Sequence, residues 1–432
     1  MIWNEAKECM SRDEMSALQS ARLVKLVDYV YHNVEFYRKK MQALGLEPGD
    51  IKDISDITKL PFTTKDDLRD NYPFGLFAVP QSQVVRVHAS SGTTGKATVV
   101  GYTRKDIEIW AECVARCFAM AGLTKDDIIQ VAYGYGLFTG GLGAHYGAEK
   151  LGAMVVPMST GNSKKLTTMM VDFGATAIAC TPSYLLHLAE VLEQENLIKD
   201  IKLKHAICGA EPWTEKMHKE IEERLHIDAN DIYGLSEIMG PGVACDCKFH
   251  KGLHVNEDHF YPEILDSKTM KTQKEGELGE LVFTTFTKEA LPLIRYRTKD
   301  LTSISYDKCE CGRTTARISR FKGRVDDMLI IRGVNVFPSQ VEAALVDVKE
   351  ISPHYMIIVD RVNNLDTLEI QLEVNPQYMP DEIRGIEALN KKITHVISQA
   401  IGLNPKVKLV EPQTLVRSEG KAVHVIDKRK LY

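Results

Sequence analysis

Between residues 84 and 235 the chain alternates short apolar runs with longer amphipathic stretches, and this alternation strongly constrains the fold. The apolar runs are too short for helices and indicate buried strands, whereas the longer stretches carry apolar residues at helical spacing. Such alternation is typical of α/β folds with mostly parallel strands. We expect strands over 84–87, 128–132, 154–157, 177–180 and 205–208, and helices over 104–120, 183–195 and 214–225.

The regions on either side of this alternation have different patterns. Residues 1–60 favour helices, and residues 261–305 favour strands after the turns at Gly276 and Gly279. The last hundred residues predict a helix over 338–345, strands over 355–360 and 368–374, a helix over 381–401 and a strand over 406–410. We therefore predict an α/β fold with two domains. Residues 1–325 form a large N-terminal domain with mostly parallel sheets and a β-rich portion, and residues 326–432 form a small α+β domain.

Charge and composition exclude several classes of protein. The 432 residues contain 54 Lys and Arg against 59 Asp and Glu, a net charge of −5, so no global basic field would attract nucleic acid. No apolar run reaches the roughly 18 residues that span a membrane, and the first residues do not resemble a secretion signal. We expect a cytoplasmic protein without nucleic-acid or membrane partners. Nine cysteines, an odd number, argue against a disulfide framework.

A loop rich in glycine and hydroxyl residues follows the first apolar run. It comprises Ser90, Ser91, Gly92, Thr93, Thr94, Gly95 and Lys96. It is not a Walker A loop, because only two residues separate its glycines and Ala97 follows the lysine. Its composition still suits phosphate, since backbone N–H groups, hydroxyls and a lysine can all donate to phosphate oxygens. The alternative interpretation is a polar turn between two strands.

Five further motifs follow this loop in a distinctive order. They occupy residues 209–211, 231–237, 295–300, 323–327 and 419–422. Together with the loop they resemble the acyl-adenylate-forming superfamily, and residues 88–103, 257–263 and 327–340 resemble its phenylacetate-CoA ligase family. The resemblance implies ATP-dependent ligation of phenylacetate, or a close aryl acid, to coenzyme A. The acid would first join the α-phosphate of ATP and release pyrophosphate, and coenzyme A would then displace AMP.

The resemblance also assigns roles to individual residues. It implies that residues 91–96 hold the β and γ phosphates, that Ser236 contacts the α-phosphate and that Glu237 binds Mg²⁺. Lys421 would reach the reacting carboxylate and phosphate once the small domain, turning about a hinge at Asp326, has closed over the site, so that domain is expected to be mobile. The remaining nucleotide-binding residues that the resemblance implies are Gly209, Ala210, Glu211, Asp231, Tyr233, Gly234, Asp300 and Arg324. Tyr233 would cover the adenine, and Asp300 would accept the ribose hydroxyls with help from Arg324.

Two glycine-containing segments predict an acyl pocket. Residues 133–141 combine aromatic residues with glycines that permit close approach of a flat ring, and residues 238–242 would form the opposite wall. The candidate lining residues are Tyr135, Phe138, Gly209, Gly240 and Pro241. A loop anchored by core aromatics is the alternative interpretation. Indoleacetate or benzoate would also fit such a pocket.

Cysteine and histidine residues gather in two segments of the chain. Residues 245–254 and 309–311 together offer enough soft ligands for a tetrahedral zinc site. We favour Cys247, His254, Cys309 and Cys311, with Cys245 and His250 as substitutes. The site would be structural, because both segments lie outside the nucleotide motifs; free reduced thiols are the alternative.

Three functions are compatible with the sequence. The first is an aryl-acid CoA ligase, which we expect to be a homodimer. The second is an adenylating enzyme that delivers the acyl group to a carrier protein. The third is a non-catalytic sensor of nucleotide or acyl groups, which is disfavoured because Glu237, Asp300 and Lys421 are all present.

Overall fold

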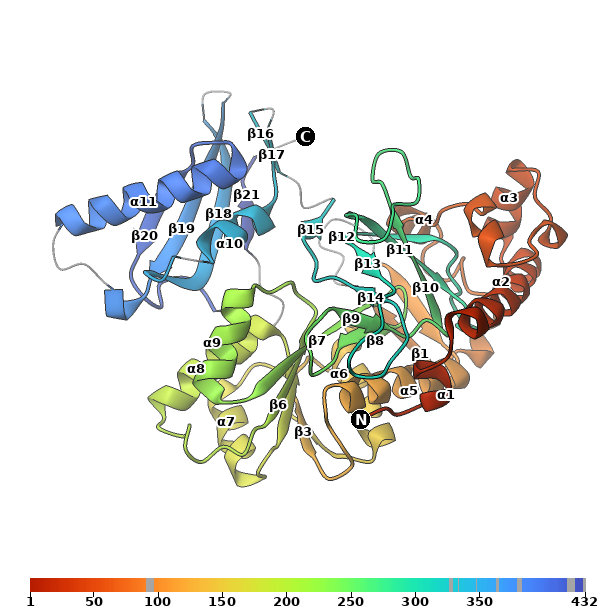
Figure 1. Ribbon diagram of the computed structural model, residues 1–432, viewed down its shortest axis with the longest axis horizontal. Helices are drawn as coiled ribbons and strands as arrows, with labels where there is room; N and C mark the ends of the chain where they lie inside the picture. Colours follow the sequence, from red (N-terminus) through yellow and green to blue (C-terminus); the bar gives the residue numbers. More distant parts are fainter. Residues whose placement is uncertain are drawn as a thin grey trace.

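The structure is a computed structural model, and it describes residues 1–90, 97–325, 329–332, 334–346, 348–362, 365–378, 383–417 and 424–429. Its largest sheet has nine strands in the order β13-β14-β9-β8-β7-β6-β5-β3-β4 (Figure 1). The pairs from β4 to β7 are parallel and those from β7 to β13 are antiparallel. The bounds are β3 Ile128–Val131, β4 Met154–Pro157, β5 Ala177–Cys180, β6 His205–Gly209, β7 Asp228–Leu235, β8 Gly240–Asp246, β9 Leu253–Val255, β13 Ile304–Ser305 and β14 Arg317–Ile318.

Helices cover this sheet and form two hydrophobic clusters with it. Three of them begin at threonines whose hydroxyls accept a backbone N–H three residues later, which satisfies a donor that the helix leaves unpaired. These capping residues are Thr103, Thr181 and Thr214. The helices are α5 Arg104–Met120, α6 Thr139–Leu151, α7 Ser163–Asp172, α8 Pro182–Gln194 and α9 Glu215–Leu225.

A second, antiparallel sheet forms the β-rich portion. Its order is β10-β11-β12-β15, with β10 at Phe260–Leu265, β11 at Gly279–Thr285, β12 at Tyr296–Thr302 and β15 at Gly323–Arg324. Every residue of β11 is buried, so this strand lacks the half-exposed pattern of a surface strand. The N-terminal helix α2 (Arg12–Asn33) contributes to the same hydrophobic cluster as β11 and lies beside this sheet in Figure 1.

The C-terminal part has a separate sheet and core. The sheet order is β20-β19-β18-β21, and its hydrophobic cluster runs from Ile331 to Val407 among the described residues. In Figure 1 this part lies next to α8 and α9 of the large sheet. The elements are β16 Leu329–Ile331, β17 Val334–Val336, α10 Pro338–Leu345, β18 Ile351–Val362, β19 Leu365–Val374, α11 Ile383–Ile401, β20 Lys406–Val410 and β21 Val425–Asp427. The boundary between residues 325 and 326 stays a prediction.

The predicted α/β class is confirmed, and several elements have the predicted bounds, including β4, β5, β20, α5 and α10. The strand expected over 84–87 is wrong by two residues, because β1 is Arg86–Ala89 and pairs with β2, Val99–Tyr102. None of the helices in the described ranges is both long and apolar enough to cross a membrane.

Candidate active site

Two of the predicted motifs, 209–211 and 231–237, reach the carboxyl ends of the parallel strands β6 and β7, where ligands of open α/β sheets bind. Gly209 ends β6, and residues 233–237 run from the end of β7 into the following turn. The predicted phosphate loop connects β1 to β2, and its residues Ser91, Gly92, Thr93, Thr94, Gly95 and Lys96 lie outside the described residues. At the base of this loop, the Ser90 hydroxyl lies 2.7 Å from the Thr98 hydroxyl and accepts the Thr98 N–H at 3.0 Å.

Tyr233, Asp300 and Arg324 form a connected group. The Tyr233 hydroxyl donates to one carboxylate oxygen of Asp300 at 2.6 Å, and the Arg324 guanidinium donates to the other at 3.0 Å. Strand pairing explains the second contact, because Asp300 on β12 lies directly opposite Arg324 on β15. The Tyr233 ring stacks on Phe321 with centroids 4.4 Å apart. Burial raises the pKa of Tyr233 well above its ordinary value, so the hydroxyl remains protonated and donates.

Glu237 lies close to the base of the phosphate loop. Its carboxylate accepts from the Thr98 hydroxyl at 3.3 Å, and its side chain is buried. Below it, the buried Lys288 ammonium donates to the carbonyls of Glu237 and Ile238 at 3.2 and 3.0 Å. Burial lowers the pKa of Lys288 to about 8. Lys288 was not predicted, since nothing in the sequence around it distinguishes it from a surface lysine.

Two glycines of the site are required by close backbone approach. A Cβ atom at Gly209 would lie 2.2 Å from the Ile232 carbonyl oxygen, and one at Gly234 would lie 1.8 Å from the Gly240 carbonyl oxygen. Any side chain at these positions would therefore displace the neighbouring strand. The glycines bring the ends of β6, β7 and β8 together around the predicted nucleotide site.

Ala210, Glu211 and Asp231 complete the predicted nucleotide group. Ala210 has a positive φ of 72°, and the Glu211 carboxylate accepts the Ser183 N–H at 2.7 Å. Burial, reinforced by the nearby carboxylate of Asp246, raises the pKa of Asp231 to about 7. Ala210 and Glu211 directly follow the end of β6, and Asp231 lies on β7 two residues before Tyr233.

The two predicted walls of the acyl pocket lie against each other. Ser236 lies just before the wall of residues 238–242, and Thr139, at the start of α6, belongs to the wall of residues 133–141. The two hydroxyls lie 3.1 Å apart. The Trp110 indole donates to the Pro241 carbonyl at 2.8 Å, while Gly240 has a positive φ of 99°. On the other wall, the Tyr135 hydroxyl lies 3.2 Å from Nδ1 of His145.

Phe138, the remaining aromatic residue of the predicted pocket, caps the start of α6. The residue is 44% exposed, so it does not anchor a buried core as the alternative interpretation requires. Lys421 and Asp326 lie outside the described residues.

The favoured cysteines and histidine meet in one cluster. Ligand atoms of Cys247, His254, Cys309 and Cys311 all lie within 4.8 Å of one another. The Cys247 and Cys309 sulfurs are 3.8 Å apart, and the Cys311 sulfur is 3.4 Å from Nε2 of His254. Zinc bonds of about 2.3 Å to sulfur and 2.0–2.1 Å to nitrogen produce ligand spacings of about this size in a tetrahedron. The four residues therefore fit zinc.

The two substitute ligands have other partners. The Cys245 thiol is buried and donates to the Cys117 carbonyl at 3.7 Å, and His250 lies 2.9 Å from both Asp246 and Asp228. In contrast, Nδ1 of His254 lies 3.1 Å from the Thr315 hydroxyl, which leaves Nε2 directed at the sulfurs.

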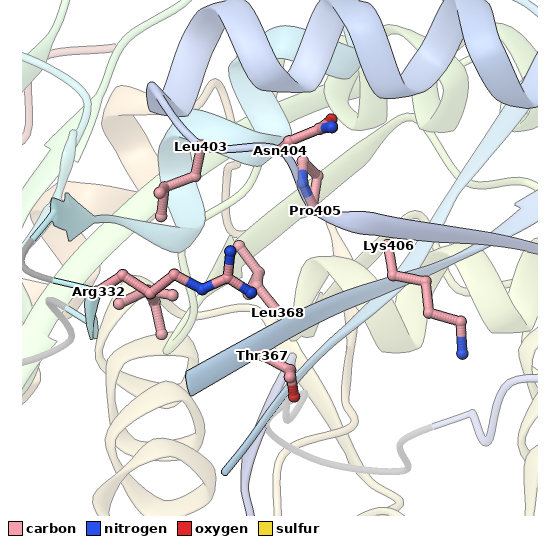
Figure 2. Close-up of a pocket in the computed structure, with 8 residues that line it drawn as sticks. Arg332, Thr367, Leu368, Leu403, Asn404, Pro405 and Lys406 are labelled. Atoms are coloured by element: carbon pink, nitrogen blue, oxygen red, sulfur yellow. The ribbon is translucent and has the colours of Figure 1, made fainter. Parts of the chain in front are cut away.

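A separate pocket of about 300 Å³ lies in the C-terminal part (Figure 2). Arg332 and Lys406 line it, but the Arg332 guanidinium donates to the Asp366 carbonyl at 2.8 Å and Lys406 pairs with Glu369 at 2.8 Å. Among the described residues, none of the predicted site residues lines this pocket.

The fold and the site define an adenylate-forming enzyme. A family model described as AMP-binding enzyme matches residues 42–286, and a second, the AMP-binding enzyme C-terminal domain, matches residues 333–429. The chain is 47% identical to a phenylacetate-coenzyme A ligase of Thermus thermophilus, with 100% of both chains covered. It is 51% identical to a phenylacetate-coenzyme A ligase of Escherichia coli, over 98% of this chain and 97% of that protein. The chain belongs to the phenylacetate-coenzyme A ligase family of AMP-binding enzymes, as the motifs predicted.

A solved relative indicates how the two parts are arranged. The structure matches 2-hydroxyisobutyryl-CoA ligase in the postadenylation state, in complex with 2-HIB-AMP, with a TM-score of 0.92, at 30% identity and over 98% of this chain and 92% of that one. Against the same enzyme with 2-HIB-AMP and CoA in the thioesterification state, the TM-score is 0.73 over the same coverage. The structure is thus more similar to the postadenylation state of that relative than to its thioesterification state.

Proposed function

We propose that this chain ligates phenylacetate, or a close aryl acid, to coenzyme A through an acyl-adenylate. A carboxylate oxygen of the acid attacks the α-phosphorus of ATP, and pyrophosphate leaves. The thiol of coenzyme A then attacks the acyl carbon, loses its proton, and AMP leaves. The observation that carries the proposal is the hydrogen-bonded group of Tyr233, Asp300 and Arg324, in a chain that matches curated phenylacetate-coenzyme A ligases over nearly its full length.

Each residue has a part in this reaction. Asp300, whose carboxylate is held from two sides, would accept the ribose hydroxyls, and Tyr233 would cover the adenine. The Glu237 carboxylate suits a hard cation and would hold Mg²⁺, which neutralises phosphate charge when bound. Lys288 would act as a positioning residue, because it fixes the backbone that carries Glu237. Lys421 would stabilise the charge that develops on the phosphate in the transition state.

The proposed function is tested by coenzyme A-dependent release of AMP from ATP and Mg²⁺. The panel of acids contains phenylacetate, 4-hydroxyphenylacetate, indoleacetate, benzoate, acetate and a medium-chain fatty acid. We expect phenylacetate or a close aryl acid to exceed the aliphatic acids by about tenfold or more, as a fitted aromatic pocket would produce. Pyrophosphate exchange without AMP release would instead indicate a carrier protein as acceptor. Silence in both assays would favour the sensor.

Replacement of Asp300 tests the ribose assignment. Asp300→Asn keeps the shape of the side chain but removes its charge and one acceptor, so we expect the KM for ATP to rise by about tenfold or more. The KM for the aryl acid should change little. Steady-state AMP release at varied ATP gives both values, and Asp307→Asn, an exposed aspartate on the same segment, is the control. An unchanged KM for ATP would refute this role.

We also propose that Cys247, His254, Cys309 and Cys311 hold a structural zinc ion. The support is the tetrahedral spacing of the ligand atoms and the contact between His254 and Thr315, which orients the imidazole. The cluster joins the end of β8 to the segment before β14. A homodimer and a cytoplasmic location stay predictions.

A further inference from the structure

A charged cluster crosses the contact between the large sheet and the C-terminal part. At its centre is Glu190 on α8, whose side chain is only 16% exposed. Its carboxylate lies 3.2 Å from the Arg417 guanidinium and 3.4 Å from Nε2 of His354, and both of these residues belong to the C-terminal part. His187, one turn earlier on α8, lies 3.6 Å away. In Figure 1, α8 and α9 lie on the side of the large sheet that is next to the C-terminal part.

The charges in this cluster compensate one another. Burial alone would raise the pKa of Glu190, but the contacts with His187, His354 and Arg417 lower it below its ordinary value. The carboxylate is therefore ionised at neutral pH. A buried carboxylate that loses such partners is left uncompensated, so the contacts favour the orientation in which they form.

Arg417 is also fixed on its own side of the contact. Its guanidinium forks onto the Glu373 carboxylate of β19 at 2.8 and 2.9 Å, and Glu373 is 1% exposed. The Leu415 N–H donates to the same carboxylate at 2.8 Å. Arg417 therefore joins the C-terminal sheet to α8 through two forked pairs, because it also donates to both oxygens of Glu190 at 3.2 and 3.3 Å.

A second tether lies nearby on α9. The Lys216 ammonium donates to the carbonyls of Val348 and Ile351 at 2.9 and 2.6 Å. Burial lowers the pKa of Lys216, and the two carbonyls partly replace the lost water. The two tethers thus join the C-terminal part to α8 and to α9.

The position of Arg417 in the chain connects the cluster to the chemistry. Arg417 lies four residues before Lys421. At about 3.3–3.6 Å per extended residue, four residues span at most about 14 Å. Fixing Arg417 against α8 therefore limits where the proposed catalytic lysine can lie.

We propose that Glu190, Arg417 and His354 form an interdomain latch that holds the Lys421 segment in place for adenylate formation and opens for the thioester step. The inference rests on the proposed function. With TM-scores of 0.92 and 0.73, the structure resembles the postadenylation state of 2-hydroxyisobutyryl-CoA ligase more than its thioesterification state. The three residues are positioning residues, because they act through Lys421.

The test compares Glu190→Gln with Glu193→Gln. Glu193 is on the same helix and also forks onto an arginine, Arg224 at 2.8 and 2.7 Å, but this partner belongs to α9 of the same domain. Two half-reactions are measured for each full-length protein. One is pyrophosphate exchange with the aryl acid, and the other is thioester formation from chemically prepared acyl-adenylate and coenzyme A. Thermal unfolding shows whether each variant is folded.

We expect Glu190→Gln to lower pyrophosphate exchange by about tenfold, while thioester formation stays within about twofold of the wild type or rises. Glu193→Gln should change neither rate by more than about twofold. If Glu190→Gln is unfolded, His354→Gln removes one arm of the latch and should shift the ratio of the two rates in the same direction.

Equal loss of both half-reactions, or a Glu190→Gln protein indistinguishable from Glu193→Gln, would overturn the latch alone. A wild type with no pyrophosphate exchange for any aryl acid would overturn the proposed function and the latch with it. A ratio unchanged in both Glu190→Gln and His354→Gln would likewise overturn the latch.

Discussion

Replacing Lys421 with alanine is expected to lower the rate of adenylate formation by about 10²- to 10³-fold or more, the range seen when one group that stabilises transition-state charge is removed. Negative charge shifts among the phosphate oxygens as the carboxylate attacks, and a lysine ammonium would stabilise it most in the transition state. ATP binding should be nearly unchanged, because the residues proposed to hold the nucleotide precede the C-terminal part. Pyrophosphate exchange gives the rate, and equilibrium binding of ATP gives the affinity.

Lys428→Ala is the matched control for this prediction. Lys428 is an exposed lysine in the same terminal stretch, and we expect its replacement to leave both quantities unchanged. Thioester formation from prepared acyl-adenylate should also survive in Lys421→Ala, since the thiol attacks the acyl carbon in that step and no bond to phosphorus forms. Unchanged pyrophosphate exchange in Lys421→Ala would contradict the assigned role.

The strands and helices of the large sheet could be predicted because each has a local pattern. β5 is four consecutive buried residues between amphipathic helices, and its bounds were predicted correctly. β1 shows where the local pattern fails. Val85 and Val87 are 53% and 39% exposed, so this apolar run is not a core strand, and pairing with β2 sets the register instead. Pairing partners that are distant in sequence leave no such local pattern.

In the candidate site, too, the sequence predicted the residues of local motifs but not the contacts that depend on the tertiary fold. Motif order identified Tyr233, Asp300 and Arg324, yet their hydrogen bonds depend on the register of β12 and β15. Lys288 was not predicted, because its contact with the Glu237 carbonyl requires the lysine to be buried. Only the tertiary fold provides that burial.

Residues 257–263 carry part of the narrower family resemblance, and two of their charged side chains form ion pairs within the protein. Glu257 pairs with Arg12 at 2.6 Å, and Asp258 pairs with Arg116 at 2.8 Å. A charge in a family motif does not distinguish a ligand contact from a buried ion pair, because both need a fixed carboxylate.

The choice among cysteines illustrates what strand geometry adds. From the sequence we favour Cys247 and keep Cys245, two residues earlier, as a substitute. Cys245 lies within β8 and its thiol points to the Cys117 carbonyl in the core, whereas Cys247 lies just past the strand end and approaches Cys309. Because β8 ends before Cys247, the chain can turn toward the segment that contains Cys309. The position of the strand end therefore favours Cys247 over Cys245 as the zinc ligand.

Loss of the proposed zinc ion is expected to lower the unfolding temperature of the protein. Wild-type protein purified without chelator should carry about one zinc per chain, and Cys311→Ser should carry much less. Because zinc binding contributes directly to folding free energy, we expect Cys311→Ser to unfold at a temperature lower by on the order of 5–10 °C. Metal analysis and thermal unfolding provide the two measurements. Cys9→Ser, a half-buried cysteine outside the cluster, is the control and should match the wild type.

The position of the cluster predicts which part of the chain is released. Arg313, two residues after Cys311, donates to the buried Glu8 carboxylate at 2.5 Å and to the Met1 carbonyl at 2.6 Å. Without zinc, residues 309–313 are no longer held to Cys247 and His254. Arg313 is then less well positioned to bind the Glu8 carboxylate and the Met1 carbonyl. Limited proteolysis of Cys311→Ser, or of wild type treated with a strong chelator, should therefore cut first near the N-terminus. Wild-type protein with less than about half a zinc per chain would contradict the metal site, because a closed structural zinc site is expected to stay filled through purification.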